Sequence, residues 1–279
     1  MTFTRPFVFL AVILVTAIAS AAKFQPDAKP VYKTIGDVEL KLHIFNPPGH
    51  KTSDKTPCIV FFFGGGWKGG SPNQFYPHCR HLASRGMVAC AAEYRVNNKH
   101  KTTPKECVKD GKSAVRWIRQ NARRLGIDPQ RVAAGGGSAG GHVAAATGTL
   151  SKFDEPGEDM SVSSRPDALV LFNPVYDNSP DGYGYDRVKD YWKSISPMHN
   201  IDAKTPPTIV FLGSLDAYVS PETAKKYCRL MTEAGRRCEL HLYEGQKHAF
   251  FNYRGGKNIY YDKTVKEMDR FLESLGYIK

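Results

Sequence analysis

A serine in a run of small residues is the first candidate for chemistry in this chain. Ser138 lies in the heptapeptide GGGSAGG at residues 135–141, which contains the pattern Gly-x-Ser-x-Gly. A short apolar segment at 132–134 precedes it, and a helix is expected over 141–149. Between a strand and a helix, this pattern is typical of a tight turn that lifts a serine hydroxyl above the edge of a sheet. The alternative is a Gly-rich turn with an incidental serine, so the interpretation depends on finding partners for Ser138.

An acid and a histidine later in the chain could activate this serine. Asp216 follows the apolar segment 208–212, and His248 follows the segment 239–243. In a parallel sheet both would lie at the carboxyl edge, where ligands bind. A histidine can take the proton of a serine hydroxyl and return it to the leaving group, while a carboxylate holds the imidazole tautomer. Hydrolases built on such a sheet use the same order of serine, acid and histidine along the chain.

A Gly-rich loop offers backbone amides for a developing negative charge. Residues 64–66 are all glycine and come directly after the apolar run 58–63. The N–H groups of Gly65, Gly66 and Ala139 are predicted to form an oxyanion hole, in which one donor is typically worth about 10²–10³ in rate. A phosphate-binding loop is disfavoured because no Gly-Lys-Ser/Thr sequence follows.

Aromatic residues near the ends of the predicted strands are expected to line a substrate cleft, although such residues are often simply part of the core. These candidates are Trp67, Tyr218 and Phe250. His142, one turn into the helix after the serine, is expected to pack in the interior and not to act as a second base. Asp177 follows another predicted strand and is an alternative acid that ranks behind Asp216.

These candidates require a sheet that brings strand ends together, and the apolar pattern predicts one. Continuous apolar runs predict strands buried on both faces at 58–63, 87–92, 168–172 and 208–212. Residues 31–44 alternate between apolar and polar around the turn Gly36-Asp37, which predicts an N-terminal antiparallel hairpin at a sheet edge.

Helix signals alternate with these strands. Thr103 and Glu106 form a capping-box pattern around Pro104, and Gly126 should end the helix that begins there. Helices are also expected over 221–234 and 260–275. His78 and His81 are expected on an exposed helix surface.

Strands that alternate with helices predict an α/β fold with a mostly parallel central sheet flanked by helices. Residues 23–279 are expected to form one catalytic domain, and the irregular segments 151–164 and 177–205 are expected to be small lid insertions.

The N-terminus has the features of a secretory signal peptide. Arg5 precedes an apolar stretch at 7–18, and small residues follow up to a cleavage site expected near Ala21-Ala22. Residues 1–22 are therefore expected to direct the protein to the periplasm or the exterior. The apolar stretch is short for a membrane span, so no stable membrane anchor is expected.

Cysteine content and net charge limit which metal sites, cofactors and partners the protein could have. Export would permit disulfides, but the six cysteines could equally be small core residues, and their pairing stays open. No Cys-x-x-Cys pair is present, so no metal site is expected, and nothing calls for a cofactor. The net charge of +12 is spread along the chain without a dense basic run, which disfavours nucleic acid as a partner. The oligomeric state stays open.

Together these motifs resemble those of the α/β-hydrolases of the esterase/lipase type, near the hormone-sensitive-lipase-like and the feruloyl and acetyl-xylan-esterase-like groups. The motifs are FGGGW at 63–67, GGSAGGH at 136–142, GSLD at 213–216 and HAF at 248–250. The resemblance implies a catalytic triad of Ser138, Asp216 and His248. It also implies oxyanion donors at Gly65, Gly66 and Ala139.

Two positions depart from the family pattern. Phe63 stands where the family usually has a histidine that braces the glycine loop, and Gly137 replaces an acidic residue common in the lipase-like group. The second departure favours the small-esterase groups. The resemblance implies a secreted serine esterase that acts on short acyl or aryl esters through an acyl-serine, with polysaccharide-linked esters as one option. The alternatives are an amide or formamide hydrolase, a peptidase of the same fold, or a binding protein that has lost the chemistry.

Overall fold

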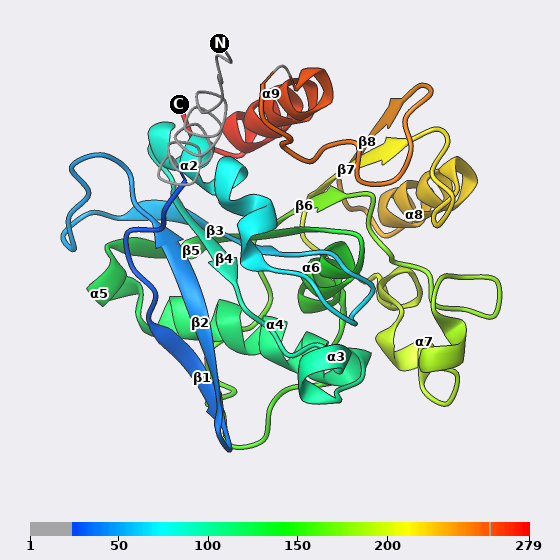
Figure 1. Ribbon diagram of the computed structural model, residues 1–279, viewed down its shortest axis with the longest axis horizontal. Coiled ribbons are helices and arrows are strands. Elements are labelled where there is room, and N and C mark those ends of the chain that lie inside the picture. The colour runs from blue at the N-terminus through cyan, green and yellow to red at the C-terminus, as the bar shows by residue number, and fades with distance from the viewer. Residues whose placement is uncertain (1–23, 257) are drawn as a thin grey trace, which may run out of the picture.

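The computed structural model describes residues 24–256 and 258–279, so the predicted signal peptide lies outside the described residues. The described chain contains a sheet of eight strands in the order β1-β2-β4-β3-β5-β6-β7-β8 (Figure 1). The strands are β1 (Val31–Ile35), β2 (Val38–Phe45), β3 (Thr56–Phe62), β4 (Val88–Ala92), β5 (Ile127–Gly137), β6 (Ala168–Phe172), β7 (Thr208–Gly213) and β8 (Cys238–Tyr243).

The sheet has the topology that the sequence predicts. β1 pairs with β2 and β2 pairs with β4 in antiparallel fashion, and every later pair is parallel. β4, β6 and β7 are buried along their whole length, which explains why they read as continuous apolar runs. The predicted α/β fold with an N-terminal antiparallel pair is therefore confirmed. Because β5, β6, β7 and β8 run parallel, their carboxyl ends share one edge.

Helices cover both faces of the sheet (Figure 1). α2 (Tyr76–Ser84) and α9 (Ile259–Ser274) pack on one face, while α4 (Pro104–Gln120), α6 (Ala139–Thr149) and α8 (Pro221–Glu233) pack on the other. The remaining helical elements are short. They are η1 (Pro72–Phe75), α3 (Asn97–His100), α5 (Ala122–Leu125), η2 (Tyr185–Arg187), α7 (Trp192–Ile195) and η3 (Pro197–Asn200). No helix in the described part of the chain is long and apolar enough to cross a membrane.

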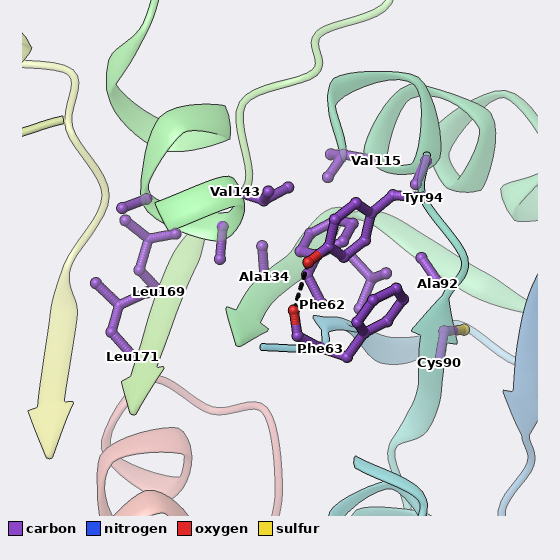
Figure 2. Packing of buried hydrophobic residues seen from close by; sticks show 14 of the residues in the cluster. Phe62, Phe63, Cys90, Ala92, Tyr94, Val115, Ala134, Val143, Leu169 and Leu171 are labelled. Carbon is purple, nitrogen blue, oxygen red and sulfur yellow. Dashed lines mark hydrogen bonds between the residues drawn. The ribbon is translucent and has the colours of Figure 1, made fainter. Parts of the chain in front are cut away.

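Alternate residues of each inner strand enter different hydrophobic clusters, as the period of a strand requires. In β3, Phe61 packs on the α2 and α9 face, whereas Phe62 packs on the α4 and α6 face. Figure 2 shows the cluster on the α4 and α6 face, in which Phe62 lies near Tyr94, Val115 and Val143. These two layers hold the carboxyl ends of the strands in fixed positions.

Helix α4 begins as predicted but ends earlier. Both hydrogen bonds of the Thr103–Glu106 capping box are present. The sequence suggests one helix up to residue 125, yet α4 ends at Gln120 and α5 follows. At the break the Asn121 side chain donates to the Trp117 carbonyl at 2.9 Å, and Gly126 ends α5 with a φ of +63°.

The prediction that His78 is exposed is wrong. His78 lies on α2 and is fully buried among Phe75, Phe172 and Tyr261, and neither of its ring nitrogens has a hydrogen-bond partner among the described residues. Burial lowers its pKa to about 3, and the nearby His81 adds to the lowering. Helix α9 covers this side of α2, because Asp269 of α9 lies 2.9 Å from the His81 ring. A helix about 190 residues further along the chain cannot be foreseen from the pattern of α2 alone.

Two buried ion-pair networks attach the first irregular segment to the scaffold. The first joins Lys33 of β1, Arg95, and Asp110 of α4 to Glu155, with Lys33 Nζ 2.7 Å from both carboxylates. The second joins α4 to Asp154 and Glu158. Its cations are Lys112 and Arg116, which are both almost fully buried. These ion pairs therefore fix residues 151–164 against α4, near the edge of the sheet that β1 forms and far from β8.

One cysteine pair is oxidised. Cys228 of α8 and Cys238 of β8 form a disulfide that ties the helix to the edge strand of the sheet. The other four cysteines are free and buried in the core. The pairing left open by the sequence thus has one bridge among the described residues.

Candidate active site

Ser138 occupies a sharp turn between β5 and α6. Its φ is +54° and its ψ is −121°, a backbone conformation that residues other than glycine adopt only under constraint. The constraint comes from close packing of α6 against β3. A Cβ on Gly140 would lie 2.0 Å from the carbonyl oxygen of Phe62, so only glycine fits there. The predicted strand–turn–helix setting of Ser138 is present.

The three predicted triad residues form one chain of hydrogen bonds. His248 Nε2 lies 2.9 Å from Ser138 Oγ, and His248 Nδ1 lies 2.7 Å from Asp216 Oδ2. The other carboxylate oxygen accepts the backbone N–H groups of Tyr218 and Val219 at 2.9 and 3.2 Å. The Asp216 side chain is fully buried, whereas that of His248 keeps some exposure. This arrangement can move a proton from the serine hydroxyl to the imidazole.

A fourth polar residue contacts His248 and was not among the sequence candidates. Asn173 follows β6 directly, and its Nδ2 lies 3.4 Å from His248 Nε2. Its Oδ1 accepts the backbone N–H of Ala249 at 2.9 Å. The sequence carries a signal for this residue, because Asn173 directly follows a predicted buried strand, in one of the loops that also supply Asp216 and His248. The sequence-based candidate in that loop is Asp177, four residues further along.

The Gly-rich loop lies beside the serine. A Cβ on Gly64 would be 3.2 Å from the Cβ of Ser138. Gly65 has a φ of +128°, and a Cβ there would lie 2.2 Å from the Gly69 carbonyl oxygen. In the described part of the chain no hydrogen bond occupies the N–H of Gly65 or Gly66. Ala139 is the first residue of α6, a position whose N–H has no partner within the helix.

Polar contacts brace this loop where the resemblance would place a histidine. The ring of Phe63 stacks on Tyr94 with centroids 4.2 Å apart, and the Tyr94 hydroxyl donates to the Phe63 carbonyl at 2.6 Å (Figure 2). Gln74 accepts the N–H of Gly64 at 2.6 Å. Arg187 Nη1 donates to the Gly66 carbonyl at 2.7 Å. The loop is therefore held from three sides without the family histidine.

The three aromatic candidates have different environments. Tyr218 is 56% exposed, and its ring meets the His248 ring edge-to-face at 4.8 Å. Trp67 is only 2% exposed, because it packs edge-on against His142. Phe250 packs against Tyr243 and Tyr260 on the other side of the histidine loop.

His142 is buried, as expected of a packing residue. Its Nε2 lies 3.0 Å from the Ile195 carbonyl oxygen in the 177–205 segment. Burial lowers the pKa of His142 to about 4. This residue therefore links the helix that follows Ser138 to the 177–205 segment.

Two cavities flank the triad. One of about 520 Å³ lies beside His248 and Phe250, with Lys247 and Arg254 in its wall. The other, of about 230 Å³, lies beside Asp216 and Tyr218. Asp177 lines this second cavity, and the carboxylate that bonds His248 is that of Asp216. Within the described residues, no cluster of three or more His, Cys, Asp or Glu side chains could hold a metal ion.

Comparison with known proteins identifies similar chains. Residues 42–179 match the family model BD-FAE, and residues 169–275 match that of the dienelactone hydrolase family. The apo form of Thermogutta terrifontis esterase 2 is 46% identical, over 90% of this chain and 96% of that one, with a TM-score of 0.87. A structure of the same esterase with propionate bound has a TM-score of 0.86 at 45% identity, over 90% and 95% of the two chains. Carboxylesterase NlhH of Mycobacterium tuberculosis is 25% identical over 253 residues, which cover 82% of this chain and 77% of that protein.

Proposed function

Because the chain belongs to the α/β-hydrolases of the esterase/lipase type and is a carboxylic-ester hydrolase, we propose that it cleaves short acyl or aryl esters through an acyl-enzyme on Ser138. The observation that carries this proposal is the hydrogen-bond chain from Ser138 through His248 to Asp216. The chemistry needs a base within hydrogen-bond reach of the hydroxyl and a carboxylate that orients the base, and both are present.

The proposed reaction has two halves. In the first, His248 Nε2 takes the proton as Ser138 Oγ attacks the ester carbonyl, and the proton then passes to the leaving alkoxide oxygen as the ester C–O bond breaks. In the second, His248 Nε2 takes a proton from a water molecule as its oxygen attacks the acyl carbonyl. The bond between the acyl carbon and Ser138 Oγ then breaks, the proton passes from Nε2 to Oγ, and the acid is released. The oxyanion of each tetrahedral intermediate is bound by the N–H groups of Gly65, Gly66 and Ala139.

The family and one structural neighbour support the proposed substrate class. Solved structures of Thermogutta terrifontis esterase 2 include complexes with propionate and with butyrate. At 44–45% identity, a comparable short-acyl preference is the simplest proposal for this chain. Tyr218, exposed beside His248, is proposed to contact the substrate, and the cavities at Asp216 and His248 give space for its two ends.

Export remains part of the proposal. The charged, apolar and small-residue order of residues 1–22 is that of a signal peptide. The Cys228–Cys238 disulfide fits an oxidising compartment, since reducing cytosol keeps most thiols free.

The test compares the mature protein with Ser138→Ala on p-nitrophenyl acetate, butyrate and a long-chain ester. We expect wild-type turnover on the short esters and a loss of at least about 10³-fold in Ser138→Ala, as for removal of a catalytic nucleophile. Labelling with paraoxon, followed by peptide mass spectrometry, should place the phosphoryl group on Ser138. Equal turnover by the two proteins, or a label elsewhere, would reject the mechanism.

A further inference from the structure

The side chain of Asn173 is fully buried between β6 and the loop that carries His248. Its backbone φ is +35°, and its own N–H donates to the Phe211 carbonyl of β7 at 2.7 Å. Both ends of the carboxamide face the histidine loop, one toward the Ala249 backbone and the other toward the His248 ring. Because Asn173 is buried and has a disfavoured backbone conformation, we infer that its surroundings hold it in this conformation.

The orientation of the carboxamide is set by chemistry. The backbone N–H of Ala249 can only donate, so the atom 2.9 Å from it is the amide oxygen. The amide nitrogen is thereby directed at His248 Nε2, 3.4 Å away. In the described part of the chain this is the single polar contact of that nitrogen. A hydrogen-bond donor thus faces the ring atom that must accept the serine proton.

A donor at this position affects the two protonation states of Nε2 in opposite ways. Neutral Nε2 has a lone pair toward which both the Ser138 hydroxyl and the amide N–H can point. Once Nε2 carries a proton, the amide N–H faces another N–H, and their partial positive charges repel. The amide therefore favours the state in which the proton has left Nε2.

We propose that Asn173 is a positioning residue for His248, whose amide oxygen fixes the loop and whose amide N–H drives the transferred proton from Nε2 on to the leaving group. The proposal rests on the proposed serine mechanism. In the step concerned, the Nε2–H bond breaks, the proton joins the leaving alkoxide oxygen, and the ester C–O bond breaks with its electron pair going to that oxygen.

Other groups around His248 do not share this function. Asp216 bonds the opposite ring nitrogen, and Tyr218 meets the ring at its edge. Lys247 and Arg254 line the cavity beside His248 but make no polar contact with Nε2 among the described residues. Besides Ser138, Asn173 alone presents a polar atom to Nε2 in the described chain.

The test uses Asn173→Asp, which keeps the shape and the acceptor for Ala249 but exchanges the donor for an anionic acceptor. Asp also tolerates positive φ, so the backbone can remain. We expect the acid limb of the kcat/KM profile to move to higher pH by about 1–3 units, because a nearby carboxylate stabilises the imidazolium. We also expect kcat to fall about 10- to 100-fold. Asn121→Asp, at the distant end of α4, adds the same charge and should change neither quantity.

A second variant covers the case in which Asn173→Asp does not fold. Asn173→Gly removes the amide at a position where glycine relieves the positive φ. It should lower kcat and move the acid limb in the same direction by a smaller amount. The protonation of His248 can also be followed without turnover, by the NMR shift of its Cε1–H, assigned through the loss of that signal in His248→Gln.

The outcomes separate this inference from the proposed function. An NMR midpoint for His248 that stays within 0.2 pH units (roughly the reading error) in Asn173→Gly, with kcat within about twofold, would overturn the role of the amide. Equal ester turnover by wild type and Ser138→Ala would instead overturn the serine mechanism, whatever the midpoint does. A midpoint shift with kcat unchanged would reject the onward proton transfer.

Discussion

Three residues with backbone conformations that are rare outside glycine lie around His248. Ser138, Asn173 and Ala249 have φ angles of +54°, +35° and +65°. Each such residue typically costs about 1–3 kcal/mol. The strain is offset by hydrogen bonds, since the Ser138 N–H bonds the Phe172 carbonyl and the Ala249 N–H bonds Asn173. Neighbouring backbone thus holds the proposed nucleophile Ser138 and the proposed base His248 in place before substrate binds.

Replacing Gly140 should disrupt the serine turn. A Cβ there would lie 2.0 and 2.3 Å from the carbonyl oxygens of Phe62 and Phe63, at the end of β3. β3 cannot move away without breaking its pairing with β4 and β5. Gly140→Ala should therefore lower the free energy of unfolding by about 3 kcal/mol or more and reduce ester turnover strongly. Urea denaturation measures the first effect. Gly69→Ala, where a Cβ would have its nearest neighbour at 3.9 Å, should stay within about 0.5 kcal/mol of wild type. Equal stability of the two variants would contradict the packing argument.

At the scale of elements, the Gly-rich loop and the 177–205 segment are held together by direct contacts. Arg187 of η2 donates to the Gly66 carbonyl and lies over the Trp67 ring at 5.9 Å. The Trp67 ring in turn packs against His142, which bonds the Ile195 carbonyl. The segment expected as a lid insertion therefore also sets the shape of the predicted oxyanion hole.

Arg187→Met should weaken catalysis more than binding. The Gly66 carbonyl loses its donor, so the neighbouring N–H groups should lose alignment with the transition-state oxygen. We expect kcat to fall about 10-fold while KM changes less than about twofold, because the ground-state ester does not depend on this alignment. Free guanidinium at millimolar concentration should restore part of the rate. Arg165→Met, which removes the pair with Asp202, serves as control. A rise in KM with kcat unchanged would instead place Arg187 in substrate binding.

The disulfide supports the element that carries the histidine. Cys228 and Cys238 are 10 residues apart and join α8 to β8, whose last residue lies five positions before His248. Closing a loop of this size removes denatured-state entropy worth about 2–3 kcal/mol. The double variant Cys228→Ser/Cys238→Ser should lose about that much unfolding free energy. Dithiothreitol should destabilise the wild type to a similar degree and leave the double variant unaffected, whereas a wild type insensitive to the reductant would refute this role.

At the scale of the whole molecule, two buried neutral histidines make stability depend on pH. Burial lowers the pKa values of His78 and His142 to about 3 and about 4. The unfolded chain binds their protons below about pH 6.5, whereas the folded chain does not until these lower values. Their stabilising contribution is therefore complete above about pH 6.5 and decreases as the pH falls from there.

His78→Phe should flatten this dependence. Between pH 7 and pH 5, each buried histidine should remove about 2 kcal/mol of unfolding free energy, from 1.36 kcal/mol per unit. Phenylalanine suits the surrounding rings and has no proton to gain. Urea titrations at the two pH values should show a loss about 2 kcal/mol smaller in His78→Phe than in wild type. Identical losses would mean that His78 is protonated in the folded state.

The sequence predicts features that depend on local pattern and strand order, and misses those that depend on distant packing. Apolar runs locate β3, β4, β6 and β7, and the residues after strand ends identify Ser138, Asp216 and His248. The burial of His78 depends on α9, and the loop contact of Arg187 depends on how the 177–205 segment folds back. Neither of these long-range contacts leaves a periodic pattern in the sequence. The cysteine positions alone likewise do not predict which two of the six form a disulfide.

The buried ion-pair networks have a consequence for heating. They bind residues 151–164 to α4 and to β1, which is the edge strand at the opposite end of the sheet from β8. The penalty for removing charges from water decreases as temperature rises, so such networks retain their strength when heated. The edge strand β8 has half-buried residues along much of its length, and its disulfide joins it to α8. Among the described residues no buried ion-pair network joins β8 to the rest of the sheet. We therefore expect a thermal unfolding intermediate in which the sheet around Ser138 remains folded while β8 and the loop that carries His248 have detached. Such an intermediate would be largely folded but would no longer hydrolyse esters.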